Sequence, residues 1–204
     1  MAIKTFTTGE VLTASDTNTY LANSGLVAVK PSAVTNGTII SGTASATVNA
    51  TQSTVVLKDV FSSTFDSYRV VISNLTMSNT LGTTNMFAKL HDGTNPASTN
   101  YNYGIVRIDM ASSAVQGTGA QGSTNGVLFG SGTGDKFGAS FDVINPNLAT
   151  HTLFNGLQWI QVSGGYSGAG GGMHQTSTAY TSLQIAPSTG TMTGGTITVY
   201  GYRK

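Results

Sequence analysis

The sequence offers three histidines and eight acidic residues as candidates for metal binding or acid–base chemistry. His91, His151 and His174 could in principle bind a metal together with Asp92 or Asp142. Metal-binding histidines in proteins usually recur at short fixed spacings such as H-x-H or H-E-x-x-H, and neither spacing occurs here. We therefore expect structural histidines and no metal site.

Paired carboxylates are the second candidate chemistry. Glycoside hydrolysis needs two carboxyl groups roughly 5 to 9.5 Å apart, and Asp135 and Asp142 are the pair that one element could bring together. The other acidic residues mostly flank turns or begin strands, where Asp is common for local hydrogen bonding. The serines form no G-x-S-x-G nucleophile motif. We expect no catalytic residue and no enzymatic activity.

Gly117, Gly119 and Gly122 spell G-x-G-x-x-G. A dinucleotide-binding fold requires this motif between a strand and a helix, because the helix N-terminus holds the pyrophosphate. The residues that follow, STNGVLFGSG, do not have a helical pattern. The motif is interpreted as part of a loop, and no cofactor is expected.

Aromatic residues give a candidate ligand or neighbour contact. Flat aromatic faces beside Asn, Gln and Thr side chains suit a saccharide, whose C–H faces stack and whose hydroxyls need hydrogen-bond partners. In the alternative reading, the tryptophan fills the core and the tyrosines surround it. The candidate residues are Tyr101, Tyr103, Trp159, Tyr166 and Tyr180.

The N-terminal stretch FTTGEVLTASDTNTYLANSGLV is the part of the chain with a helical pattern. Thr13 and Asp16 resemble a capping box, and Gly25 suits the end of a helix. We expect a helix over residues 14–23, within an attachment segment covering residues 1–30. A helix this short is marginal alone and needs a partner. The expected docking residues are Val11, Leu12, Tyr20, Leu21 and Leu26.

The rest of the chain has a β pattern. Residues 31–53 are small and polar and are interpreted as a linker or extended segment, and residues 54–204 as one β domain. Short runs of alternating hydrophobic residues without intervening helices predict an antiparallel, jelly-roll-like β-sandwich. The expected strands are 54–61, 68–75, 85–91, 104–110, 137–144, 151–162, 180–186 and 195–202.

Turn signals lie at Asp92-Gly93, Asn125-Gly126, Asn155-Gly156 and Thr193-Gly194-Gly195. Such residues readily adopt a positive φ. Two longer Gly-rich stretches, residues 112–126 and 163–173, are predicted to be exposed loops that contact a neighbour or a ligand.

The composition restricts the class of protein. Charged residues make up only 8% of the 204 residues, hydrophobic residues make up 39%, and the net charge is +1. The low charge fits a surface partly covered by partners. The basic residues are scattered, which argues against nucleic-acid binding. No apolar run reaches the length of a signal peptide or a membrane span, and there is no cysteine, so we expect synthesis in a cytosol without export by the usual route.

Three stretches resemble structural proteins of tailed bacteriophages, including those of cyanophages and other aquatic phages. The motif G-E-V-L-T-A-x-D-x-N near the N-terminus leads into a short helix in that group. The end of the chain has the finish T-G-G-x-I-x-V-Y-G-Y-R-K, and residues 61–75 contain F-x-x-x-[YF]-D-x-Y-R. The resemblance covers about a third of the chain. It implies that the protein belongs to a virion, but it identifies no catalytic residues.

The resemblance implies a virion structural protein, first of all a tail-fibre or tail-appendage subunit that docks by its N-terminus and presents loops outward. Homotrimers are typical of that group. Other virion proteins are the expected partners, and a host surface glycan is a further candidate. The alternatives are a capsid decoration or cement protein and a carbohydrate-binding receptor-recognition module.

Overall fold

The structure is a computed structural model that describes residues 7–11, 13, 25–78, 84–132, 136–161 and 165–203. The expected helix over residues 14–23 lies outside the described residues, as do Leu12, Tyr20 and Leu21. The described residues contain strands and no helix, so the all-β expectation is confirmed for this part of the chain.

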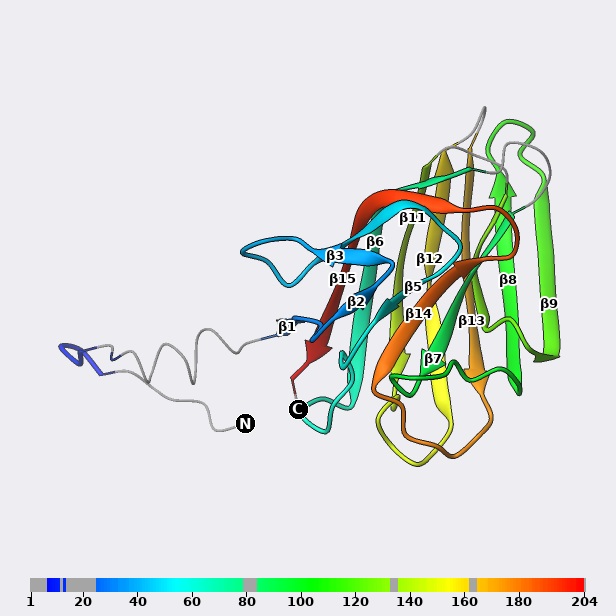
Figure 1. The fold of residues 1–204 in the computed structure, drawn as a ribbon. Helices are drawn as coiled ribbons and strands as arrows, with labels where there is room; N and C mark the ends of the chain where they lie inside the picture. The colour runs from blue at the N-terminus through cyan, green and yellow to red at the C-terminus, as the bar shows by residue number, and fades with distance from the viewer. Residues whose placement is uncertain are drawn as a thin grey trace.

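The strands form two antiparallel sheets that face each other (Figure 1). The larger sheet has ten strands in the order β3-β4-β15-β6-β11-β12-β13-β8-β9, with β1 also paired to β15, and the smaller has five in the order β10-β7-β14-β5-β2. We call this two-layer body the sandwich. Its strands are β1 (Leu26–Val29), β2 (Val34–Thr35), β3 (Gly37–Ile39), β4 (Ala46–Gln52), β5 (Val55–Leu57), β6 (Ser67–Met77), β7 (Thr84–His91), β8 (Tyr101–Asp109), β9 (Val115–Ser123), β10 (Val127–Gly132), β11 (Lys136–Ile144), β12 (Thr152–Gln161), β13 (Tyr166–His174), β14 (Ser182–Pro187) and β15 (Met192–Tyr202).

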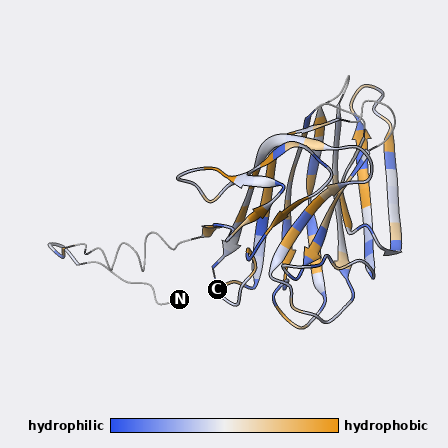
Figure 2. Cartoon of the chain, viewed as in Figure 1, coloured by the Kyte–Doolittle hydropathy of each residue, from blue (hydrophilic) through white to orange (hydrophobic). Residues whose placement is uncertain are grey.

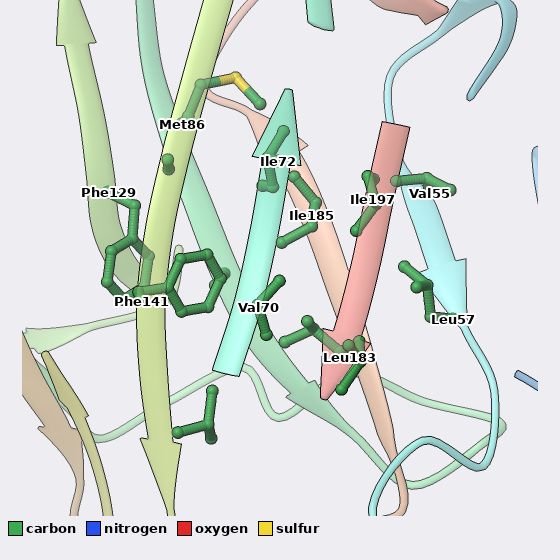
Figure 3. Packing of buried hydrophobic residues seen from close by; sticks show 14 of the residues in the cluster. Val55, Leu57, Val70, Ile72, Met86, Phe129, Phe141, Leu183, Ile185 and Ile197 are labelled. Atoms are coloured by element: carbon green, nitrogen blue, oxygen red, sulfur yellow. The ribbon is translucent and has the colours of Figure 1, made fainter. Parts of the chain in front are cut away.

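The hydrophobic core fills the space between the two sheets (Figure 3). Strand β11 shows how the sequence builds it, since Phe137, Ala139, Phe141 and Val143 are all buried on one side, as their period of two predicts. The ring of Phe141 stacks on that of Phe129 from the smaller sheet, with ring centroids 3.9 Å apart. Alternation thus gives β11 one core face and one outer face, and Figure 2 shows hydrophobic and hydrophilic residues interspersed along the strands.

Polar atoms also join the two layers. The buried hydroxyl of Tyr101, on β8, accepts a hydrogen bond of 2.8 Å from the backbone N–H of Leu90, on β7. The hydroxyl of Tyr68 accepts from the backbone N–H of Ser62 and donates to its carbonyl, both at 2.7 Å. These bonds satisfy tyrosine oxygens that burial would otherwise leave without partners.

The stretch expected to be a linker, residues 31–53, contributes strands to both sheets. β2 pairs with β5 in the smaller sheet, while β3 and β4 extend the larger one beside β15. Ala46 and Val48 on β4 are buried in the core. The polar composition hides this role because β4 alternates buried and exposed residues over only a few positions. The linker prediction is therefore wrong.

Most of each Gly-rich stretch forms a strand in the described chain, which corrects the prediction of loops. Residues 115–123 form β9 at the edge of the larger sheet, and residues 166–174 form β13 in its interior. Two predicted turns are also strand positions: Asn155 and Gly156 pair with Asp142 and Phe141 inside the sheet. Gly194 and Gly195 form an irregularity within β15, where both have a positive φ.

The segment expected to attach the protein, residues 1–30, overlaps the larger sheet. Leu26, expected to be a docking residue, is the first residue of β1 and pairs with Tyr202 of the last strand. Val11 is exposed. Gly25, just before β1, has a φ of 88°, a conformation that glycine adopts readily.

Candidate functional site

The outer face of the larger sheet carries most of the large hydrophobic side chains that the described residues leave exposed. On β12 the buried Phe154 and Ile160 point to the core, so Leu153, Leu157 and Trp159 point outward, 40%, 64% and 41% exposed. The neighbouring strands continue the pattern. The exposed members on this face are Val106, Ile108, Val115, Leu153, Leu157 and Trp159.

The strand register places these residues in rows that cross the sheet. Trp159 pairs with Ser167, Ser167 with Ile108, and Ile108 with Val115, at the edge. In the next row, Leu157 pairs with Ala169, and Ala169 with Val106. Directly paired residues of adjacent strands lie within contact distance of one another. The exposed hydrophobic residues therefore form one connected region.

Charge is almost absent from this region. None of the outward-facing residues of β12, β13, β8 and β9 is charged. Small residues, including Gly104, Gly117, Gly119 and Gly171, occupy the positions between the hydrophobic ones. A connected apolar region of this kind usually marks a binding surface on a soluble protein.

Trp159 has a fixed place on this face because its indole covers Gly138 on the adjacent strand. The two residues are directly paired. A Cβ atom at position 138 would lie 2.2 Å from the indole Nε1 and 2.3 Å from Cε2. The ring therefore occupies the space that a side chain at position 138 would take. The indole thus lies against the sheet, while Trp159 as a whole remains 41% exposed.

A groove of about 360 Å³ lies beside the indole. Its walls come from β6, β11, β12 and β13, and Val71 and Leu157 give it apolar surface. Three serines, Ser73, Ser140 and Ser167, add hydroxyl groups. The groove thus combines an aromatic plane, aliphatic side chains and short polar groups, which is the usual composition of a small-molecule site.

Three charged residues of the described chain lie near the groove on this face: Lys136, whose Nζ donates to the hydroxyl of Thr76 at 2.7 Å, and the ion pair of Arg69 with Asp142. Arg69 donates to Asp142 through Nε at 2.9 Å and through Nη2 at 3.0 Å, and the hydroxyl of Tyr202 donates to the same carboxylate at 2.7 Å. Burial by itself would raise the pKa of the Asp142 carboxyl, but the hydrogen bonds from Arg69 and Tyr202 outweigh it and hold that pKa below its usual value. Asp142 is thus an ion-pair partner and a poor proton donor.

The five aromatic residues expected to form one contact site are separated by the sheet. Trp159 is on the outer face, whereas Tyr166 is paired with Ile160 on the core side and lies under the guanidinium of Arg107. Tyr101 and Tyr180 are buried in the core, and Tyr103 packs against Phe87. Trp159 alone of the five lies at the groove. The alternative interpretation, in which the tryptophan fills the core, is wrong, because Trp159 is 41% exposed.

Gly138, which lies under the indole, and the groove residues Ser73 and Ser140 are the parts of the site that the sequence did not reveal. They are far from Trp159 along the chain and reach it through strand pairing. The alternation of residues 152–161 could have placed Trp159 on the same face as Leu153 and Leu157. The residues that lie next to Trp159 on neighbouring strands could be identified only from the strand register.

The residues considered for other chemistry lie apart. Among the described residues, no three His, Cys, Asp or Glu side chains gather into a metal site. Gly117 and Gly119 are on the edge strand β9 and no helix follows them in the described chain. The Asp92 carboxylate accepts from the backbone N–H groups of Thr94 and Asn95, as expected for a turn residue, and Asp135 is outside the described residues.

No family model matches the chain, and neither a curated protein nor a solved structure matches it. In the part of the chain that the structure describes, no helix is long and apolar enough to cross a membrane.

Proposed function

We propose that the chain is a structural subunit of a tailed-phage virion, in the first place of a tail fibre or tail appendage, and that it works by binding. The observation that carries the proposal is the uncharged part of the outer face formed by β12, β13, β8 and β9, with its connected exposed hydrophobic residues. Such a face is typical of a protein that remains bound to other subunits in an assembly. The resemblance of both chain ends to phage structural proteins is the reason for proposing that this assembly is a phage virion.

The strip nearest the sheet edge suits a neighbouring protein. Val106, Ile108 and Val115 lie on the two outermost strands, β8 and β9. Strand β9 has nine residues without charge or proline, and its outer edge has no partner strand in the described chain. Charges and prolines are the features that usually keep a free edge from pairing. We call this region the β8/β9 strip, and a second copy of the chain is the partner proposed for it.

In this proposal the N-terminal segment, with Val11, Leu12, Tyr20 and Leu21, attaches the subunit to the particle. The jelly-roll-like sandwich then presents its outer face and not Gly-rich loops. Because β1 begins at Leu26 and belongs to the larger sheet, a truncation that tests attachment should end at residue 24. The truncated protein should fold but fail to enter particles. Incorporation at the wild-type level would contradict the attachment role.

Particle fractionation tests the virion setting. The phage whose genome carries the gene is propagated, and its particles are purified on a density gradient and analysed by mass spectrometry. The chain should sediment with intact particles at a constant ratio to the major capsid protein. A chain that stays in the unsedimented lysate would contradict the proposal.

The place within the particle separates tail from head. A tag at the C-terminus, detected by electron microscopy, should mark the tail in the leading proposal. A label on the head would favour a capsid decoration or cement protein. Sedimentation of the purified protein tests self-association, for which a trimer is expected. A monomer at micromolar concentration would exclude the proposed contact between copies.

A further inference from the structure

We propose that the groove beside Trp159 binds one pyranose ring of a neutral saccharide, stacked on the open face of the indole. This site belongs to the sandwich itself, so it can be tested apart from the virion proposal. It lies on β6, β11, β12 and β13, beside the β8/β9 strip, and none of Val106, Ile108 and Val115 lines it. A partner covering the strip is therefore distinct from a ligand in the groove.

The aromatic plane is the first element of the site. The indole rests on Gly138, where no side chain competes for its place. An aromatic face is electron-rich and attracts the positively polarised C–H groups of a sugar ring. Because the ring is already positioned, binding costs little side-chain entropy. A rigid, half-exposed indole beside a groove is thus suited to stack on a flat, weakly polar ring.

Hydroxyl groups around the plane are the second element. The side chains of Ser73, Ser140 and Ser167 line the groove, and none of them has a hydrogen bond to another described residue. A serine hydroxyl can both donate and accept, as can each hydroxyl of a sugar. A purely aliphatic ligand would leave these serines without partners. The combination therefore favours a polyhydroxylated ring over a hydrocarbon.

The absence of charge from the lining is the third element. No charged residue of the described chain lines the groove; on the same face, Asp142 is paired with Arg69, and the Nζ of Lys136 donates to the hydroxyl of Thr76 at 2.7 Å. A phosphate or carboxylate ligand would therefore find no cation among the residues that line the groove. The volume of about 360 Å³ is near the lower end of the range usual for ligand sites, roughly 300 to 1,000 Å³. The site thus fits one sugar ring and selects neutral sugars.

The sequence provides a direct probe, because Trp159 is its one tryptophan. A glycan array carrying neutral, sialylated and sulfated glycans identifies a ligand, which is then titrated against the full-length protein by tryptophan fluorescence. At least one neutral glycan should bind and give a saturable change in emission. Absence of neutral binders, or binding of anionic glycans alone, would overturn the proposal.

Two variants separate stacking from general damage. Trp159→Ala should lower affinity at least about tenfold, because it removes the aromatic plane. Gly138→Ala keeps the indole but displaces it from its position over the sheet, so the affinity for the glycan should fall to a similar degree. Ser140→Ala should cost about fivefold through one lost hydrogen bond. Array binding measures these affinities, and circular dichroism confirms that each variant is folded.

Leu153→Ala is the matched control. Leu153 is on the same strand and the same face and is similarly exposed, but it does not line the groove. This variant should bind the glycan like the wild type. If folded Trp159→Ala binds with wild-type affinity, or if Leu153→Ala loses as much as Trp159→Ala, the site is not where we place it.

Discussion

Two buried histidines are the residues whose protonation should control stability. The ring of His174 lies between those of Tyr101 and Tyr180, with centroids 4.6 and 5.4 Å away. His91 accepts a hydrogen bond at Nδ1 from the backbone N–H of Gly93. Burial lowers the pKa of both imidazoles below the ordinary value of 6.5. Both are therefore expected to be neutral in the folded protein near pH 7.

The pH dependence of stability follows from those shifts. As the pH falls below about 6.5, the unfolded chain takes up protons at these positions before the folded chain does. The free energy of unfolding should therefore be highest above this pH and decrease as the pH falls toward the lower folded pKa values. Urea unfolding at pH 7.5 and pH 5.0 measures the difference.

The variant His174→Phe removes one of the two titrating groups. Its own stability can differ from that of the wild type, but its loss between pH 7.5 and pH 5.0 should be smaller. An equal loss in both proteins would show that His174 does not contribute.

Glycines are the feature that defines strand β13. A Cβ atom at Gly168, Gly170, Gly171 or Gly172 would lie less than 3.0 Å from the backbone of a neighbouring strand. At Gly172 the nearest atom is the backbone oxygen of Asn102, at 2.3 Å. Small residues are thus required where these strands approach each other, and the glycine run is a packing feature.

Gly172→Ala should therefore destabilise the protein by about 1 to 3 kcal/mol through overpacking. Gly104, on the neighbouring strand β8, provides the control because a Cβ atom there would meet nothing within 4 Å. Gly104→Ala should be neutral or stabilising by up to about 1 kcal/mol. Thermal unfolding of the two variants measures the contrast, and equal effects would contradict the packing explanation.

The same glycines explain how far the sequence could predict the elements. Where large hydrophobic residues alternate, as at Phe137, Phe141 and Val143, the strand and its buried face were predictable. In β9 and β13 the side chains are too small to produce that alternation, and glycine usually signals a loop. Of the candidate site, the sequence could indicate only Trp159. Gly138 and Ser140 come close to it through the pairing of strands, which the sequence does not reveal.

At the scale of the whole molecule, the first and last strands of the described chain pair in the larger sheet. On the edge of β15 opposite β6, β1 pairs with residues 199–202 and β4 pairs with residues between 192 and 197. The last strand is thus held by residues that precede position 54. The sandwich accordingly begins near residue 25, and its N-terminal strands are part of its core.

Two shortened chains test this boundary. A protein that begins at residue 25 should unfold cooperatively at nearly the temperature of the full chain, since it keeps every described strand. One that begins at residue 54 lacks β1 to β4 and exposes β15, so it should show no cooperative transition. Circular dichroism on heating distinguishes them. A cooperative transition at the full-length midpoint in the shorter chain would restore the linker interpretation.

The central claim is that the outer face of the larger sheet is the binding surface of a virion subunit. Hydroxyl-radical footprinting, read by mass spectrometry, compares each side chain in purified particles and in the free protein. Val106, Ile108 and Val115 should be protected in particles, while Leu148, exposed elsewhere, should react equally in both. Unchanged reactivity of all three residues in particles that contain the chain would contradict the claim.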